Sequence, residues 1–199
     1  MFLRDTSEDD PPPNETIDAW LANKVERARA GDQKAFTVLF NHYNAQICTH
    51  LIRLVHSESI AHDLAQNTFY KAWKQLPALN KPACFKSWIY KIATNEANDY
   101  IRRARPAEPL SAAEEEYSLP QQFIVEGPEK QVAEVDQITW ILAQLPPQQR
   151  TCLVLQVEGF TQKEIAELVG ISEKNVSVCI SRAREKCREL MRRVKGEQA

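Results

Sequence analysis

The chain has 199 residues, of which 43% are hydrophobic, and its formal net charge is −2. This length suits one domain of ordinary size or two small ones, with enough apolar residues for a core. Five cysteines without CxxC spacing argue against a disulfide framework and against a zinc site. No apolar run approaches the roughly 20 residues of a membrane helix, and the acidic N-terminus is unlike a secretory signal. We therefore expect a soluble, cytoplasmic protein that is not inserted in a membrane.

Charge is unevenly distributed along the chain. Residues 36–105 hold nine basic and four acidic residues, and residues 161–195 hold nine basic and five acidic ones. Between them, residues 107–136 hold eight acidic residues and one basic residue, a net charge of −7. Because basic surfaces attract polyanions, this alternation predicts two modules that face nucleic acid and a segment that does not touch it.

Apolar residues recur at helical spacing through most of the chain, and nothing resembles the alternation of a strand. Residues 1–16 are acidic and rich in proline, which predicts a disordered tail. Residues 106–128 carry prolines and a glutamate cluster, which predicts a flexible acidic linker. The sequence thus predicts an all-α fold with two small helical domains, residues 17–105 and 129–195, held apart by that linker. Helices are expected from 17 to the break at Gly31, and over 34–55, 60–76, 85–105, 129–145, 149–157 and 161–184.

Residues 161–184 have the pattern of a helix-turn-helix. Thr161 and Glu164 can form a capping box, and Gly170 stands where the chain must reverse. Ser172 can cap a second short helix, which in such motifs enters the major groove of DNA. The alternative is an ordinary helical hairpin with a charged surface. The outward side chains of the second helix are the candidate contacts to duplex DNA: Lys174, Asn175, Ser177, Val178, Ser181, Arg182 and Arg184.

A second candidate DNA-binding surface lies on the helix expected at 85–105 and on the loop before it, at 77–84. Basic groups neutralise phosphates, aromatic rings stack on unpaired bases and amide side chains bond to base edges, as a single-strand surface requires. The alternative for the two aromatic residues is a place in the core. The candidate residues are Asn80, Lys81, Trp88, Tyr90, Lys91, Asn95, Asn98, Arg102 and Arg103.

Three runs, in this order, resemble the sigma-70 family of RNA polymerase initiation factors, in its short, two-domain extracytoplasmic-function form. They are DLAQNTFYKAW at 63–73, FKSWIYKIATNEANDYIRR at 85–103, and the run from LPPQQR at 145 to the helix-turn-helix, which ends at 185. The resemblance covers roughly residues 24–190.

The resemblance implies a sigma factor, which is not an enzyme and needs no cofactor or metal. Its N-terminal domain would bind the β′ clamp helices of core RNA polymerase and would recognise and melt the −10 element. Its C-terminal domain would sit on the β flap and read the −35 element, while the linker would thread towards the active-site cleft. It also implies an anti-sigma factor as a partner and a monomer within the holoenzyme. The implied polymerase contacts are Asp63, Leu64, Gln66, Asn67 and Phe69.

Some residues depart from this family's usual pattern. Asn67 stands where glutamate is usual, so one polymerase contact loses a charge. Cys179 is expected near the DNA-facing side as an inert hydrophobic residue, with redox sensing as the alternative. His56 and His62 flank a helix start without a carboxylate or cysteine at ligand spacing, which favours packed or solvated side chains.

Two other functions are compatible with the residues alone. The first is a conventional helix-turn-helix regulator whose N-terminal helices dimerise or sense a signal. The second is an interaction module whose degenerate helix-turn-helix does not contact DNA.

Overall fold

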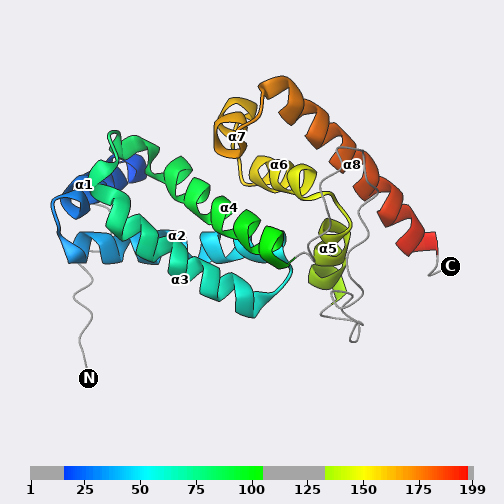
Figure 1. The fold of residues 1–199 in the computed structure, drawn as a ribbon, viewed down its shortest axis with the longest axis horizontal. Helices are drawn as coiled ribbons and strands as arrows, with labels where there is room; N and C mark the ends of the chain where they lie inside the picture. The colour runs from blue at the N-terminus through cyan, green and yellow to red at the C-terminus, as the bar shows by residue number, and fades with distance from the viewer. Residues whose placement is uncertain (1–15, 105–132, 197–199) are drawn as a thin grey trace.

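The computed structural model describes residues 16–104 and 133–196 (Figure 1). The helices are α1 (Ile17–Arg29), α2 (Gln33–Val55), α3 (Glu58–Gln75), α4 (Phe85–Ala104), α5 (Ala133–Ala143), α6 (Pro147–Val157), α7 (Gln162–Val169) and α8 (Glu173–Gly196). The described ranges contain no strand. Helices α1 to α4 pack together, as do α5 to α8, which confirms the expected all-α fold with two helical domains (Figure 1). The expected linker at 106–128, and all of the expected tail except residue 16, lie outside the described residues.

Side-chain caps set the helix boundaries in the N-terminal domain. Asp32 accepts a hydrogen bond from the backbone N–H of Ala35 at the start of α2, and Ser57 caps α3 in the same way. The bond from Ala35, together with the nearby Arg27 guanidinium, lowers the pKa of Asp32. Because Ser57 is the cap, α3 begins two residues before the start that periodicity predicts. The expected loop before α4 contains two short 3₁₀ turns, Leu76–Ala78 and Pro82–Cys84.

Helix α2 is the centre of the N-terminal domain and packs against α1, α3 and α4. Its inner side is almost completely removed from water, with Leu39, Ile47 and Leu51 all 0% exposed. Burial of each such side chain stabilises the fold by roughly 1.5–3 kcal/mol. One polar residue, His50, lies in this apolar stripe and is equally buried.

The C-terminal domain contains the predicted helix-turn-helix, formed by α7 and α8. The Thr161 N–H donates to Glu164 Oε2 at 2.8 Å, and the Glu164 N–H donates to Thr161 Oγ1 at 3.3 Å, so the capping box is confirmed. The Thr161 N–H and the Thr161 hydroxyl both donate to the Glu164 carboxylate, which lowers the pKa of Glu164. Gly170 ends α7 with a φ of 77°, a left-handed conformation that glycine adopts without strain. The second helix is not short as expected, because α8 continues to Gly196.

The two domains lie side by side and touch (Figure 1). Helix α4 packs against α7, and α2 packs against α5 and α6. The expectation that the linker holds the domains apart is therefore wrong for this structure. Within the part of the chain that the structure describes, none of the helices is both long and apolar enough to cross a membrane.

Candidate nucleic-acid and polymerase interfaces

The outer side of α8 presents every residue predicted to contact duplex DNA. All seven are exposed, including the apolar Val178, of which 40% is accessible to water. The buried side of the same helix anchors it through Val176, Ile180 and Ala183, so the outer side has a fixed orientation. Arg184 bends back towards α6, where its Nη2 donates to Gln156 Oε1 at 2.8 Å.

Cys179 does not lie on this outer side, so the expectation that it lies near the DNA-facing surface is wrong. It is half-buried, packs against the core and neighbours Cys152 of α6. Burial, reinforced by Cys179, raises the pKa of Cys152 to about 12. A thiol that keeps its proton is a poor nucleophile, which favours inert packing over redox sensing for Cys152.

The predicted polar face of α4 is present, because Lys91, Asn95 and Asn98 are exposed on one side of the helix. Arg102 continues this side and is also exposed, and its Nη2 donates to Asp99 Oδ1 at 2.8 Å. Three further candidates are exposed at the two ends of this region: Asn80, Lys81 and Arg103.

The two aromatic candidates of α4 are not on that exposed face. Tyr90 is 3% exposed, with ring centroids 5.1 Å from His50 and 4.9 Å from Phe160. Tyr90 therefore cannot stack on a base in this structure, and the prediction that it contacts a base is wrong for this arrangement of the helices. Its burial raises its pKa. Trp88 is half-buried and packs against Phe85 at 5.8 Å, so the core interpretation applies to most of its ring.

The polymerase contacts implied on α3 fall on two different sides of the helix. Leu64 is 7% exposed and Phe69 is 4% exposed, so both belong to the core and cannot form a surface contact in this structure. The other three candidates, Asp63, Gln66 and Asn67, are exposed.

Tyr70 is an exposed α3 residue that the sequence interpretation missed. It is 59% exposed, and Lys74 Nζ lies 4.4 Å from its ring centroid. Its position three residues after Asn67 places both on one helix side, and this spacing is the signal that could have identified it.

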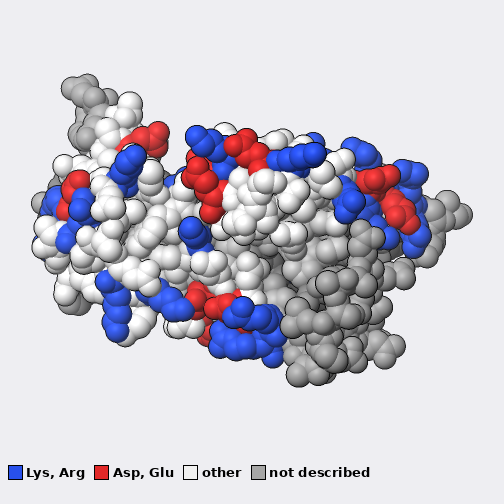
Figure 2. All heavy atoms as spheres, turned by 45° about the horizontal axis from the view of Figure 1, so that its top comes forward, with Lys and Arg blue, Asp and Glu red and all other residues white. Residues whose placement is uncertain are grey.

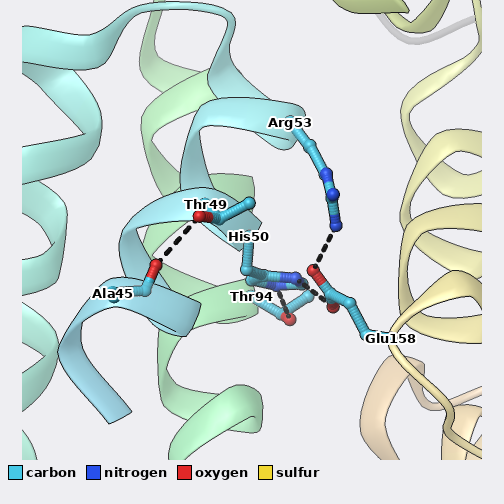
Figure 3. Close-up of polar contacts among 6 residues, drawn as sticks. All are labelled: Ala45, Thr49, His50, Arg53, Thr94 and Glu158. Atoms are coloured by element: carbon cyan, nitrogen blue, oxygen red, sulfur yellow. Dashed lines mark hydrogen bonds and ion pairs between the residues drawn. The ribbon is translucent and has the colours of Figure 1, made fainter. Parts of the chain in front are cut away.

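A polar cluster joins the two domains, and none of its members was predicted (Figure 3). His50 of α2 contacts Glu158 Oε2 through Nδ1 at 2.8 Å and Thr94 Oγ1 of α4 through Nε2 at 3.0 Å. Arg53 Nη1 lies 3.4 Å from the other Glu158 oxygen. A histidine within an apolar helical stripe is a signal that could have identified His50. The sequence holds no comparable signal for Glu158.

Arg150 of α6 makes a second contact between the domains, with His56 at the end of α2. Burial, followed by the Arg150 charge, lowers the pKa of His56 to about 3, so its imidazole is neutral at ordinary pH. His56 is therefore a packed histidine.

His62 has neighbours that its sequence position did not suggest. Its Nδ1 lies 3.7 Å from Cys48 Sγ, and its Nε2 lies 3.8 Å from Glu58 Oε1. The sequence interpretation overlooked Glu58, four residues before His62, and could not foresee Cys48, but the His62 side chain is 56% exposed and so is solvated, as one of the two expected alternatives. Among the described residues, no group of three histidine, cysteine, aspartate or glutamate side chains is arranged to hold a metal ion.

The charged side chains do not merge into one basic surface on the face drawn in Figure 2. There, Lys and Arg form separate groups, with acidic and uncharged surface between them. This face therefore carries no single continuous basic groove.

The fold and these surfaces define a two-domain helical protein that carries a DNA-binding helix-turn-helix. Family models match both domains: "Sigma-70 region 2" matches residues 39–106 and "Sigma-70, region 4" matches residues 136–187. The sigma-H factor of Pseudomonas aeruginosa is 32% identical over 173 residues, which are 81% of this chain and 88% of that one. The chain belongs to the sigma-70 family of RNA polymerase sigma factors.

Other relatives carry the extracytoplasmic-function (ECF) description. The ECF sigma-E factor of Haemophilus influenzae is 31% identical, over 81% of this chain and 89% of that protein. The ECF factor SigW of Bacillus subtilis is 28% identical, over 88% and 99%. The chain is therefore an ECF-type sigma factor, a transcription initiation factor rather than an enzyme, and the alternative of a conventional regulator is not supported.

Two solved structures share the fold. One is CnrH in complex with the cytosolic domain of CnrY, with a TM-score of 0.66 and 24% identity, covering 86% of this chain and 96% of that one. The other is the sigma factor RpoE in complex with the anti-sigma factor NepR from Bartonella quintana, with a TM-score of 0.62 and 21% identity, covering 80% and 98%.

Proposed function

We propose that this sigma factor binds core RNA polymerase through the exposed side of α3 and promoter DNA through α4 and α8. The observation that carries the proposal is that the matched region 2 exposes polar side chains on both α3 and α4, and the matched region 4 exposes them on α8. On α3, the polymerase-facing set is Asp63, Gln66, Asn67 and Tyr70, with Asn67 contributing no charge. This set would contact the β′ clamp helices.

The −35 element is read by α8 from the major groove. The side chains nearest the start of the helix are best placed to reach base edges. Asn175 can bond to both N6 and N7 of adenine, while Val178 suits the methyl group of thymine. Lys174 and Arg182 supply phosphate contacts that position the helix without reading sequence.

The −10 element is opened and held by α4. Lys91 and Arg102 attract the backbone of the displaced strand, and the amides of Asn95 and Asn98 bond to exposed base edges. Asn80 and Lys81 and the rest of the loop before α4 would hold an extruded base. Opening requires no chemistry from the chain, because tighter binding to the single strand than to the duplex shifts the equilibrium towards the open form.

The remaining parts of the proposal concern location and partners. The C-terminal domain sits on the β flap, and the acidic segment at 106–128 threads towards the active-site cleft. The chain acts as a monomer within the holoenzyme, in the cytoplasm, where the polymerase and the promoter meet. An anti-sigma factor is a partner, which the complex of the similarly folded sigma factor RpoE with the anti-sigma factor NepR supports.

Run-off transcription with purified core polymerase, from the DNA upstream of the chain's own gene, tests this function. Product that depends on added chain supports it. A footprint on duplex DNA without polymerase, and no product with it, would instead support a conventional regulator. Permanganate reactivity of the same promoter reports strand opening directly.

A double variant separates strand opening from polymerase binding. Lys91→Ala with Arg102→Ala should reduce permanganate reactivity at least tenfold, because two phosphate contacts are lost together. Binding to core polymerase should not change, since α3 is intact. Lys34→Ala, at an exposed residue of α2, is the matched control. Full reactivity in the double variant would contradict the role of α4.

A further inference from the structure

Helices α2 and α3 bring a thiol, an imidazole and an amide together at one point of their interface. Cys48 and Asn44 lie one turn apart on α2, and His62 lies near the start of α3. Cys48 Sγ is 3.7 Å from Asn44 Oδ1 and 3.7 Å from His62 Nδ1. One sulfur atom therefore has a nitrogen and an oxygen at the same distance, and all three atoms are of kinds that bind metal ions.

The two separations match those across a single zinc ion. Zinc binds thiolate sulfur at about 2.3 Å, and imidazole nitrogen or a side-chain oxygen at about 2.1 Å. Two such ligands at a tetrahedral angle are therefore about 3.6 Å apart, for sulfur with nitrogen and for sulfur with oxygen alike. Because 3.7 Å is observed in both cases, an ion can replace the thiol proton without a shift of either helix.

A carboxylate lies on the other side of the imidazole. Glu58 precedes His62 by four residues on α3, and its Oε1 is 3.8 Å from His62 Nε2. A histidine that binds a metal usually directs its other ring N–H to a carboxylate, which fixes the tautomer and makes the histidine a stronger ligand. With the proton on Nε2, facing Glu58, the lone pair of Nδ1 faces Cys48 and is available to an ion.

The cluster is anchored on one side and open on the other. Cys48 is 7% exposed, so the core of the domain holds its sulfur in place. Asn44 is half-buried, and the side chain of His62 is largely exposed. An ion can thus enter from solvent while both helices stay folded, and water can occupy its fourth coordination position.

The ligand types select the kind of ion. Thiolate sulfur and imidazole nitrogen suit zinc and the neighbouring transition metals, whereas magnesium and calcium require oxygen ligands. Cys48 binds as the thiolate, so its proton passes to solvent when the ion binds.

We propose that Cys48, His62 and Asn44 bind one zinc-type divalent ion, which joins α2 to α3, and that Glu58 orients the imidazole. His62 directly precedes Asp63, so the ion lies beside the α3 side chains assigned to polymerase. The ion needs no polymerase in order to bind, and its binding can be measured on the chain alone.

Isothermal titration of zinc chloride into the reduced, chelator-treated chain measures the site. Wild type should bind one ion, and His62→Gln should bind it at least about 100-fold more weakly, because a direct ligand is lost. Since His62 is exposed, this variant keeps its fold even where Cys48→Ser disturbs the core. Glu58→Gln and Asn44→Ala should each weaken binding about tenfold.

Two controls remove the same residue types elsewhere. His42→Gln replaces an exposed histidine of α2, and Cys84→Ser replaces an exposed cysteine before α4. Neither should change the affinity for zinc. Equal affinity in wild type, His62→Gln and Cys48→Ser would mean adventitious binding and would overturn the site, as would a wild type that binds no zinc.

Cobalt(II) identifies the ligands directly, because it takes the place of zinc and its absorption depends on the atoms around it. Cobalt on the wild-type chain should give a thiolate-to-cobalt charge-transfer band in the near ultraviolet, and Cys48→Ser should lose this band. A wild-type spectrum without the band, or the same band in Cys48→Ser, would contradict coordination by Cys48.

Thermal unfolding tests the link between the helices. An ion that binds only the folded chain raises the midpoint of unfolding. Saturating zinc chloride should therefore raise the midpoint of wild type and of both controls, but not that of His62→Gln. A rise of equal size in His62→Gln would place the ion elsewhere and refute the assignment.

Discussion

The two helices proposed to bind DNA, α4 and α8, differ in how much of their binding surface is available when the two domains are packed together. Every candidate on α8 is exposed, whereas α4 exposes its polar stripe but buries Tyr90 beneath Phe160. Helix α8 therefore exposes all of its candidate DNA contacts in this structure, whereas α4 exposes only part of its candidates. In this arrangement Tyr90 is not available to a base, and DNA can reach only the polar stripe of α4.

The largest expected effect tests whether the two domains are separate folding units. Ile165→Ala in α7 removes a side chain that is 0% exposed and should lower the unfolding free energy of the C-terminal domain by about 2–5 kcal/mol. Binding to duplex −35 DNA by the holoenzyme should fall with it. Thermal unfolding followed by circular dichroism measures the change, with Glu167→Gln as control. If both domains lose stability equally, they form one cooperative unit.

The second prediction concerns the charges on the two helices. Lys174→Ala with Arg182→Ala should reduce the slope of log K against log salt for holoenzyme binding to duplex promoter by about 1.8, at roughly 0.9 per phosphate contact. Lys91→Ala with Arg102→Ala should instead reduce the slope for a forked template by about 1.4, at roughly 0.7 per contact.

Filter binding over a range of potassium chloride concentrations measures both slopes. Lys186→Ala, which removes a partner of Glu189 on α8 but no candidate DNA contact, is the control. Equal effects of both double variants on both templates would show that the two helices do not divide the DNA between them.

The third prediction concerns pH and the contact between the domains. The pKa of His56 is lowered to about 3 by burial and then by Arg150, whereas in the unfolded chain it returns to 6.5. Below pH 6.5 the His56 imidazole binds a proton in the unfolded chain, whereas in the folded chain it stays neutral down to about pH 3. Stability is therefore complete above pH 6.5 and falls as the pH drops, by at most about 1.4 kcal/mol per unit.

Urea unfolding at pH 6.5 and pH 5.0 measures this loss. His56→Asn should show a smaller loss between the two pH values, because the proton-binding group is absent. Comparison with this variant isolates His56 from His50, which lies in the other contact between the domains. Equal pH dependence in variant and wild type would contradict the assignment.

The smallest expected effect concerns Val178 of α8 and its proposed contact with a thymine methyl group. If Val178 packs against a thymine methyl group, replacing that thymine by deoxyuridine should weaken wild-type binding about fourfold, which corresponds to about 0.8 kcal/mol for a buried methyl group. Val178→Ala should show no further loss on the same substitution. Competition with single-substituted promoters measures the ratio at each thymine of the −35 element. Equal discrimination by both proteins at every position would exclude this contact.

Much of the architecture could be predicted because its causes are local. A helix places residues three and four apart on one side, so apolar spacing alone located the buried stripes. The capping box of Thr161 and Glu164 and the glycine at the end of α7 depend on residues a few positions apart. The exposed face of α8 followed from the same periodicity.

Other features could not be predicted, because residue spacing shows which side chains share one side of a helix but not which other element packs against that side. On α3, Leu64 and Phe69 were assigned to the polymerase together with Asp63, although they belong to the core. Tyr90 stands beside the polar stripe of α4, and only the packing of Phe160 decides that it is buried.

Local patterns along the chain were enough to predict the helices, the capping box of α7, the two domains and the polar faces of α4 and α8. The contacts between the domains, including that of Glu158 with His50 across 108 residues of chain, and the burial of Tyr90 became visible only in the folded structure. The difference lies in the distance along the chain over which each effect acts. Helix periodicity and capping act within a turn or two of chain, whereas a contact between distant side chains exists only once both domains have folded and met.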